Sequence, residues 1–272
     1  MTTVLTRGVI FSDLDGTFLD GAYTPVLAGA DAQRIFSRWH VVWVSSRTAD
    51  ELCHFQQSIA HTGDAIGENG GVLLLHDRVI ASALGPVEPF HDAWLVRLAK
   101  SRAQTLQLVQ NVFADVGAAL HVIDDASDLA SASGYSLPHA ERALRRRKSV
   151  LLRPSADPRF AAALALLRAA GAFVAHGGRW ISIVVGADKG AAARAWLAAQ
   201  PEPFPIVAGI GNAGNDESLL REVDLPFVVR DAHHGHAPAL ASIVGVRLLQ
   251  RQGTQGWLEM LELLDSLAGR DS

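Results

Sequence analysis

Short apolar runs alternate with helix-length segments along most of this chain, and this alternation constrains the fold more than any other feature. A strand buried on both faces reads as a continuous hydrophobic run, and repeated strand–helix units favour a parallel sheet with helices on its faces. The sequence therefore predicts an α/β protein with a Rossmann-like parallel sheet. The expected strands are 9–11, 41–44, 205–209 and 226–229, and the expected helices are 26–39, 49–61, 189–199, 217–223 and 255–268.

The middle of the chain departs from this alternation. Predicted helices at 92–116 and 157–170 mix there with short strands at 120–123, 149–152, 173–175 and 181–185. We interpret this region as an inserted α+β domain, so that residues 1–84 and 187–272 form a core domain and residues 85–186 the insertion. Just before it, the apolar runs 72–75 and 79–81 flank a polar turn and predict a β-hairpin.

Composition narrows the classes of function. With 272 residues, 49% of them hydrophobic, the chain can bury a sizeable core and is not intrinsically disordered. A net charge of −4 argues against a nucleic-acid partner, and the apolar stretches are too short to span a membrane. The single cysteine, Cys53, excludes an internal disulfide and is expected as a small buried residue. We expect a cytoplasmic protein with neither a nucleic-acid nor a membrane partner, and the sequence specifies no oligomeric state.

Two aspartates leave the first expected strand together. Asp13 and Asp15 stand at i and i+2, so continuation of the strand would place both on one face of the sheet, and Gly16 permits a sharp turn after them. Close carboxylates repel each other unless a cation or a shared proton lies between them. The pattern favours Asp13 as a nucleophile and Mg²⁺ ligand and Asp15 as a general acid and base. An ordinary turn rich in Asp, Gly and Thr is the alternative.

Further polar residues follow other expected strands, at the edge where open α/β sheets bind ligands. Ser45 offers a hydroxyl donor and Lys189 a fixed positive charge, and both suit a phosphoryl group in transfer. A third cluster contains Asn212, Asn215 and Asp216. Taken singly, a serine at a strand end is typical of a turn, and a lysine at a helix start is typical of a solvated surface.

Taken together, these segments resemble the four motifs of the haloacid dehalogenase (HAD) superfamily of phosphohydrolases. The resemblance is carried, in the family's order, by 12–20, Ser45, 188–190 and 211–216. It implies a phosphoric monoester hydrolase in which Asp13 forms an aspartyl phosphate and Asp15 protonates the leaving group. It further implies that Ser45 and Lys189 hold the phosphoryl group. The implied cofactor is Mg²⁺, with Asp13, Asp15, Asn212 and Asp216 as the metal-binding residues.

The fourth motif departs from the family pattern. The family usually has Gly-Asp there, whereas this chain has Gly211-Asn212. An Asn oxygen can bind Mg²⁺ but contributes no negative charge, so we expect weaker metal binding or a larger share for Asp216. A weakly active or non-catalytic sugar-phosphate-binding protein is therefore an alternative. A phosphomutase, which passes the phosphoryl group to another hydroxyl, is a second one.

The resemblance extends to the insertion. Its place after 68–71 and before Lys189 is that of a type C2B cap, and the segments 44–52 and 176–180 are similar to the mannosyl-3-phosphoglycerate phosphatases. This similarity implies a small-molecule substrate with a phosphate on a glycerate joined to a hexose. The candidate substrate-binding residues are Ser46, Arg47, Arg179 and Asn215. A guanidinium group suits a carboxylate or a phosphate, although a surface salt bridge is the alternative for each arginine.

Three other patterns have simpler interpretations. The segment 209–214 satisfies G-x-G-x-x-G, but a dinucleotide site would leave Asp13 and Lys189 unexplained. The basic run 142–148 is interpreted as the solvated end of a helix, rather than as a rim that attracts an anionic substrate. The histidines of 233–236 are interpreted as loop residues rather than a transition-metal site, because adjacent histidines in a loop bounded by glycine and proline rarely converge on a metal without a carboxylate or cysteine partner.

Overall fold

The computed structural model describes residues 8–19, 35–177, 179–231 and 235–268. The chain forms two compact units. The core unit comprises Met1–Ser45, Phe55–Ala65 and Lys189–Ser272, and the insertion unit comprises Ser46–His54 and Ile66–Asp188. Residues 46–54, 66–84 and 187–188 thus group with the insertion unit, although from the sequence we assign them to the core domain, and the predicted domain limits stay a proposal. Most of the expected helix 26–39 lies outside the described residues.

The core unit is built on parallel strands. Their order is β12-β11-β10-β1-β2, and neighbouring strands all run in the same direction. The sequence predicted this arrangement from the apolar run 9–11, which forms the first three residues of the fully buried strand β1. The strands are β1 (Val9–Asp13), β2 (His40–Val44), β10 (Val207–Gly211), β11 (Leu225–Val228) and β12 (Arg247–Leu248).

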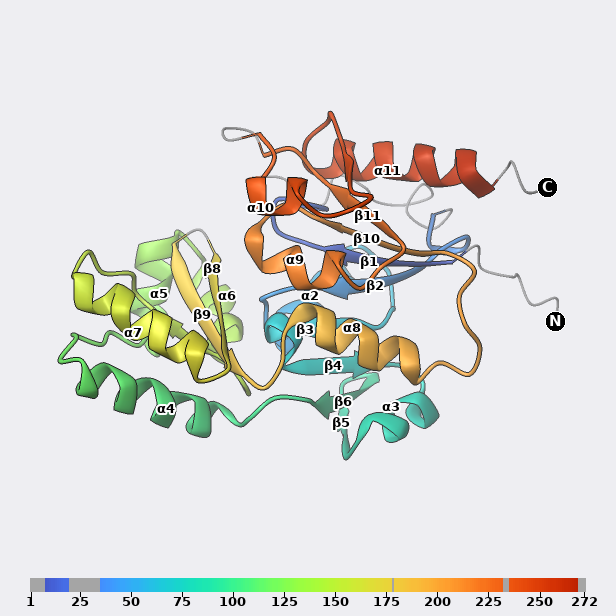
Figure 1. The fold of residues 1–272 in the computed structure, drawn as a ribbon. Helices are drawn as coiled ribbons and strands as arrows, with labels where there is room; N and C mark the ends of the chain where they lie inside the picture. Colours follow the sequence, from blue (N-terminus) through green and yellow to red (C-terminus); the bar gives the residue numbers. More distant parts are fainter. Residues whose placement is uncertain (1–7, 20–34, 178, 232–234, 269–272) are drawn as a thin grey trace. The chain divides into compact units, whose positions relative to one another are not determined.

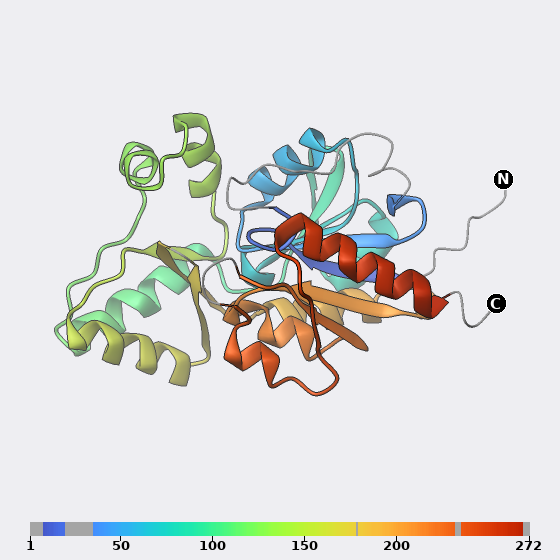
Figure 2. The ribbon, with the colours of Figure 1, turned by 90° about the horizontal axis from the view of Figure 1, so that it is seen from above.

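Helices cover both faces of this parallel sheet (Figures 1 and 2). Neighbouring residues of β1 point to opposite faces: Phe11 packs edge-on against Trp196 of α8, while Ser12 contacts Trp257 of α11. The α8 side also carries α9 and the short 3₁₀ helix η2. The helices of the unit are α8 (Lys189–Ala198), η2 (Gly214–Asp216), α9 (Glu217–Leu220), α10 (Pro238–Ala241) and α11 (Gly253–Ala268).

The first part of the insertion unit is antiparallel. Strands β4 (Val72–Leu75), β6 (Ala93–Arg97) and β5 (Val87–Phe90) lie in the order β4-β6-β5. The predicted hairpin of 72–75 with 79–81 is wrong, because the second segment belongs to helix α3 (Arg78–Leu84). Asp77 caps this helix by accepting the backbone N–H groups of Val79 and Ile80.

Two elements cross between the units in sequence. Helix α2 (Ala49–Ser58) begins in the insertion unit and ends in the core unit. Strand β3 (Ala65–Gly67) does the reverse and leads into the 3₁₀ helix η1 (Glu68–Gly70). The chain therefore leaves the core unit once at Ser46 and again at Ile66, each time just after a strand or within one.

The second part of the insertion unit is a three-stranded antiparallel sheet, β7-β9-β8, covered on both faces. Leu152 packs with helices α4 and α7, and its neighbour Leu151 packs with α5 and α6. The predicted helix 92–116 is wrong in its first part, where β6 lies, and 120–123 contributes only a single bridge, Val122 to Leu152. The elements are α4 (Arg102–Asp115), α5 (Ala126–Ser133), α6 (Leu137–Leu144), β7 (Val150–Leu152), α7 (Pro158–Ala169), β8 (Ala172–Gly177) and β9 (Trp180–Val185).

The parallel core sheet and the α+β insertion confirm the predicted fold class. Among the described residues, none of the helices combines the length and the hydropathy that a bilayer crossing requires. Aliphatic and aromatic side chains dominate the described core. Four tryptophans are buried in it: Trp43, Trp196 and Trp257 are 0% exposed and Trp39 is 2% exposed.

Candidate active site

The stretch 12–18 at the carboxyl end of β1 contains Asp13, the predicted nucleophile, and is called the nucleophile loop below. Strand β1 ends at Asp13, so a tight turn rather than the pleat of the strand places Asp15. The turn is closed by hydrogen bonds from Leu19 N to Leu14 O (2.8 Å) and from Gly16 N to Leu19 O (3.1 Å). Gly16 has φ +80°, and a Cβ there would lie 2.3 Å from Nδ2 of Asn212, so this position requires glycine.

Lys189 joins two carboxylates in the interior of the core unit. It is the first residue of α8 and is fully buried, and its Nζ lies 2.6 Å from Oδ1 of Asp13 and 2.6 Å from Oδ1 of Asp216. Burial alone would lower the pKa of Lys189, but the charges and hydrogen bonds of the two aspartates outweigh it and raise the pKa. The lysine is therefore charged at neutral pH.

Asp216 supports both the lysine and the loop after β10. While Oδ1 accepts from Lys189, Oδ2 accepts the backbone N–H groups of Asn212 and Ala213, each at 3.0 Å. Gly211 permits this, because a Cβ there would lie 2.5 Å from the Asp216 Cβ. Both oxygens of Asp216 thus already accept hydrogen bonds from the chain.

The Thr17 hydroxyl lies close to side-chain oxygens of Asp13 and Asn212. It donates to Oδ2 of Asp13 (3.0 Å) and lies 3.3 Å from Oδ1 of Asn212. From the sequence we predict no role for Thr17, although this residue stands inside the first motif. The clue in the sequence was its position four residues after Asp13, at the end of a tight turn that brings its hydroxyl back to the Asp13 carboxylate.

Burial and charge act on Asp13 in opposite directions. Burial and the neighbouring charge of Asp216 raise the pKa of Asp13 to about 7, against the lowering influence of Lys189. The lysine therefore only partly compensates two buried carboxylates that share it. A further positive charge beside Asp13 would favour the ionised carboxylate.

Metal binding would rest on mixed oxygen donors. Among the described residues, no group of three or more His, Cys, Asp or Glu is arranged to hold a metal ion. Mg²⁺ prefers oxygen ligands and keeps several waters, so it needs few protein carboxylates. The Asp13 carboxylate and the Asn212 side-chain oxygen, both in contact with the Thr17 hydroxyl, fit this preference.

Ser45 lies at the same edge of the parallel sheet. It directly follows β2, whose last residue, Val44, is the register partner of Asp13. Its side chain is 1% exposed. Asn215 belongs to η2 and is half-buried, between Asn212 and Asp216 in sequence. The structure thus collects Asp13, Lys189 and Asp216 in one buried cluster and places Ser45 one residue beyond the strand pair.

The other candidate substrate-binding residues belong to the insertion unit. Ser46 and Arg47 begin it and are half-buried. Arg179 is exposed, and its Nη1 donates to the carbonyl of Ala132 at 2.9 Å. Their roles toward a substrate remain proposals.

The interpretation of 142–148 as a solvated helix end is wrong. Arg145 and Arg147 both contact the buried carboxylate of Asp50, at 3.0 and 2.9 Å, and Arg146 donates to the carbonyl of Ser46. Helix α6 ends at Leu144, so these arginines lie in the segment after it and pack on the start of α2. The pairing of Asp50 with Arg145 and Arg147 could not be predicted from the sequence, because 95 and 97 residues separate them.

Glu68 fixes the end of the same basic run. Its fully buried carboxylate accepts the backbone N–H groups of Arg147, Lys148 and Ser149 and the Ser149 hydroxyl, at 2.7 to 2.9 Å. Glu68 and Asn69 both have positive φ, 51° and 54°. The buried carboxylate of Glu68 thus holds the segment that leads into β7. No motif in the sequence predicted this role for Glu68.

Two smaller predictions fall on described residues. Cys53 is buried, as expected, and burial followed by the charges of Asp92 and Asp50 raises the pKa of its thiol to about 11. His236 has its Nε2 2.7 Å from the carbonyl of Leu249, consistent with a loop role. His233 and His234 lie outside the described residues.

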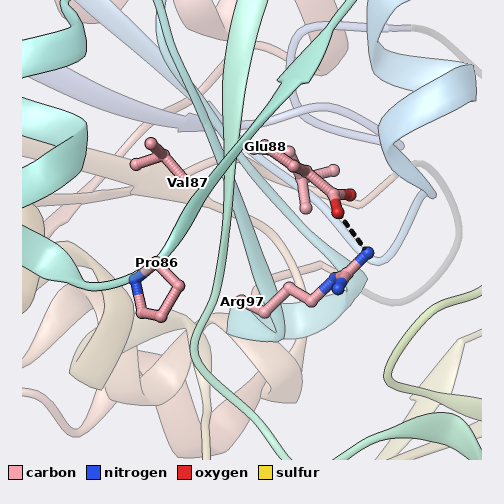
Figure 3. A pocket seen from close by; sticks show the side chains of 5 residues that line it. Pro86, Val87, Glu88 and Arg97 are labelled. Carbon is pink, nitrogen blue, oxygen red and sulfur yellow. Dashed lines mark hydrogen bonds and ion pairs between the residues drawn. The ribbon is translucent and has the colours of Figure 1, made fainter.

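A surface pocket of the insertion unit is separate from these residues (Figure 3). It encloses about 250 Å³ and is lined by Pro86, Val87, Glu88, Leu95 and Arg97 of β5, β6 and the turn before them. Arg97 closes one side through an ion pair with Glu88 at 2.6 Å. None of the predicted site residues lines it.

We compared the chain with family models and with known proteins. No family model matches the chain. It is 23% identical over 258 residues to a glucosyl-3-phosphoglycerate/mannosyl-3-phosphoglycerate phosphatase of Methanococcoides burtonii, which covers 92% of this chain and 94% of that protein.

Solved structures share the fold. A phosphatase of the HAD superfamily from Bacteroides thetaiotaomicron superposes with a TM-score of 0.67 at 13% identity, covering 97% of both chains. The sucrose-phosphatase of Synechocystis, solved with sucrose and phosphate, gives a TM-score of 0.59 at 15% identity, covering 96% of this chain and 99% of that one. The chain therefore has the fold of the HAD superfamily, and the resemblance carried by its four motifs is confirmed. Within that class it is similar to the phosphoglycerate phosphatase of M. burtonii.

Proposed function

We propose that this protein hydrolyses the phosphate monoester of a sugar-linked phosphoglycerate in an Mg²⁺-dependent reaction that passes through an aspartyl phosphate on Asp13. The observation that carries the proposal is the buried cluster at the end of β1, where one lysine holds the carboxylates of Asp13 and Asp216. The broader class is a phosphoric monoester hydrolase of the HAD type. A cytoplasmic location is part of the same proposal.

The chemistry follows from the position of Asp13. A carboxylate oxygen of Asp13 attacks phosphorus, the bond from phosphorus to the leaving oxygen breaks, and Asp15 gives that oxygen a proton. Water then attacks phosphorus, Asp15 takes its proton, and release of phosphate restores the Asp13 carboxylate. Lys189 fixes Oδ1 of Asp13 and supplies a positive charge for the equatorial oxygens, and Ser45 offers a hydroxyl to them.

Mg²⁺ suits the donors that the loop offers. We assign Asp13 and Asn212 as direct ligands together with the main-chain carbonyl of Asp15. Asp216 contributes chiefly by holding Lys189 and the backbone of Asn212, since both of its oxygens accept hydrogen bonds there. When bound, the metal offsets the repulsion between the nucleophile and the phosphate dianion.

The substrate class rests on likeness and on charge. The relative from M. burtonii is a phosphatase of glucosyl- and mannosyl-3-phosphoglycerate, and the Synechocystis structure holds sucrose and phosphate. We propose Ser46, Arg47, Arg179 and Asn215 as contacts for the glycerate carboxylate, the sugar or the phosphate. Arginine forks bind both kinds of anion in bidentate fashion.

A panel of substrates tests the proposal. Release of inorganic phosphate is measured from glucosyl- and mannosyl-3-phosphoglycerate, 3-phosphoglycerate, and hexose phosphates, with and without Mg²⁺. We expect the highest kcat/KM for a glycosylated phosphoglycerate, and no turnover by Asp13→Asn. Equal turnover of every hexose phosphate would contradict the substrate assignment, and transfer of the phosphoryl group to a second sugar hydroxyl would indicate a mutase.

Asn212 supports one alternative, a sugar-phosphate-binding protein with weak activity. Its neutral side chain stands where the family usually has an Asp, so the metal site carries one negative charge fewer. Titration of Mg²⁺ against phosphate release separates the two functions. Turnover by the wild type at millimolar Mg²⁺ supports the enzyme, whereas turnover that appears only in Asn212→Asp supports the binding protein.

A further inference from the structure

Helix α11, at the far end of the chain from the nucleophile, attaches directly to the nucleophile loop. Its first turn makes two buried hydrogen bonds to the stretch 12–18, more than 230 residues away in sequence. The indole Nε1–H of Trp257 donates to the Ser12 hydroxyl at 3.0 Å. The Thr254 hydroxyl donates to the carbonyl of Phe18 at 2.7 Å. The two contacts bracket the loop at its start and its end.

The contact from Trp257 reaches the nucleophile through one hydroxyl. Ser12 donates its only hydroxyl hydrogen to the main-chain carbonyl of Asp13, at 2.8 Å, and its oxygen accepts the indole hydrogen of Trp257. Since an indole N–H can only donate, the direction of this chain is fixed from Trp257 through Ser12 to Asp13. Both Ser12 and Trp257 are fully buried, so water cannot replace either partner.

The contact from Thr254 secures the other end of the loop. Phe18 lies in an aromatic cluster, with ring centroids 5.2 Å from Trp257 and 4.8 Å from Trp43. Thr17, the residue before Phe18, donates its hydroxyl to Oδ2 of Asp13. A shift at Phe18 would therefore move Thr17, and with it the hydrogen bond that orients the attacking carboxylate.

We infer that Trp257 and Thr254 are positioning residues for the phosphoryl-transfer reaction, Trp257 acting on Asp13 through the Ser12 hydroxyl and Thr254 acting on Thr17 through the Phe18 carbonyl. The inference deepens the proposed function, and its kinetic part rests on it. Phosphoryl transfer depends mainly on the placement of groups, so a small displacement of Asp13 lowers kcat while substrate binding is retained.

The chain offers a matched control. Trp196 is a second fully buried tryptophan of the core unit, and its Nε1–H donates to Asp64 at 2.8 Å. It packs on the opposite face of β1, against Phe11. Trp257→Phe and Trp196→Phe each remove one buried indole hydrogen bond and keep an aromatic ring. They differ in the acceptor that is lost, which is Ser12 in the nucleophile loop for Trp257 and Asp64 for Trp196. Thr254→Val and Thr254→Ser form the second pair, in which only serine keeps the hydroxyl.

Steady-state phosphate release and amide hydrogen exchange of a peptide covering residues 8–19 are measured for all four variants at a temperature where each is folded. We expect kcat to fall on the order of tenfold or more in Trp257→Phe and Thr254→Val with KM nearly unchanged. We expect faster exchange in that peptide for these two, and near wild-type values for Trp196→Phe and Thr254→Ser.

A double-mutant cycle tests the route through Ser12. Ser12→Ala removes the hydroxyl that joins Trp257 to Asp13, so adding Trp257→Phe in that background should lower kcat no further. Independent effects of the two changes would overturn this route. Equal kcat and equal exchange in Trp257→Phe and Trp196→Phe would overturn the positioning role altogether. If the wild type hydrolyses no phosphate ester, the proposed function fails, and the exchange data alone decide whether α11 holds the loop.

Discussion

The charge cluster around Lys189 in the core unit and the charge cluster around Asp50 in the insertion unit are built in opposite ways. In the first, one fully buried cation is shared by two carboxylates, those of Asp13 and Asp216. In the second, one buried carboxylate is shared by Arg145 and Arg147. When the groups of each cluster are ionised, the first has one negative charge in excess and the second one positive charge in excess; burial and the charge of Asp216 accordingly raise the pKa of Asp13.

The two clusters therefore favour ions of opposite sign. A negative cluster at the end of a parallel strand favours a divalent cation, which carries no specificity for an organic substrate. A positive cluster of guanidinium groups favours an anion of defined shape, such as a carboxylate. The comparison teaches that buried charge is stabilised in opposite ways in the two units: a shared lysine holds two carboxylates in the core unit, and in the insertion unit Asp50 is the anion that two guanidinium groups hold.

The largest expected effect is on the core cluster. Lys189→Met leaves two carboxylates buried without their cation, and we expect the free energy of unfolding to fall by about 3–5 kcal/mol. We expect kcat to fall on the order of 10²–10³-fold, because the positive charge at the transferring phosphoryl group is lost. Urea unfolding and phosphate release measure the two effects.

Arg194 provides the control for that substitution. It lies on the same helix, α8, but its side chain is 65% exposed in an ion pair with Glu222. Arg194→Met should change stability by less than about 1 kcal/mol and leave turnover unchanged. A comparable loss in both variants would show that the buried cluster has no special weight.

The next effect concerns the insertion cluster. Asp50→Asn removes the charge that holds Arg145 and Arg147 together, and we expect a loss of stability of about 1–3 kcal/mol. Because the Asp50 side chain is 8% exposed and both arginines are less buried, the loss should be smaller than that from Lys189→Met. Glu88→Gln, which breaks the more exposed pair with Arg97, should cost less than about 1 kcal/mol. A neutral Asp50→Asn would contradict the assigned role of Asp50.

A third prediction uses pH. Burial alone would raise the pKa of Glu51, but its hydrogen bond with His139 and the charges of Arg146 and Arg47 outweigh this and lower it. A carboxylate with a depressed folded-state pKa stabilises the protein above its unfolded value of about 4.5, and this contribution is lost as the pH falls through the folded-state pKa. Glu51→Gln should therefore flatten the dependence of unfolding free energy on pH below about 4.5. Identical acid profiles for the two proteins would contradict it.

The smallest effect concerns Cys53. Its pKa of about 11 keeps the thiol protonated at neutral pH, so alkylation by iodoacetamide should be slow at pH 8 and faster as the pH rises toward 11. Labelling of the native protein is followed by mass spectrometry, with the urea-unfolded protein as the reference. Equal rates for the two states at pH 8 would contradict the shielding of this thiol.

The sequence was most informative where local pattern and chemistry coincide. The continuous apolar run of β1 predicted a buried parallel strand, and the four motifs singled out Asp13, Lys189 and Asp216, which the structure brings together. The nearness of Asp13 and Asp216 could be predicted because β1 and β10 are parallel neighbours whose carboxyl ends meet at one edge of the sheet. Lys189 follows the antiparallel strand β9, so only the resemblance to the family's motifs predicted its place beside them. The support from Thr17 could be predicted in part, since it stands within the first motif.

Long-range contacts set the limit of sequence reasoning. Nothing in the sequence around Trp257 or Asp50 marks the partner that each has in the fold. The hairpin prediction at 72–81 was wrong because Asp77 acts as a helix cap rather than as a turn residue. The first part of 92–116 was wrong because Ser101 and Gln104 form a capping box that starts α4 later. In both places polar capping residues, rather than hydrophobic periodicity, determine where the helix begins.

The central claim is that Asp13 carries the phosphoryl group. Wild-type protein is mixed with substrate and Mg²⁺, quenched in acid within milliseconds, digested, and analysed by mass spectrometry for phosphorylated peptides. We predict a phosphorylated peptide that contains Asp13, formed and lost at rates compatible with kcat, and neither phosphopeptide nor turnover in Asp13→Asn. Wild-type turnover by Asp13→Asn, or a phosphoryl group found on a different residue, would contradict the account.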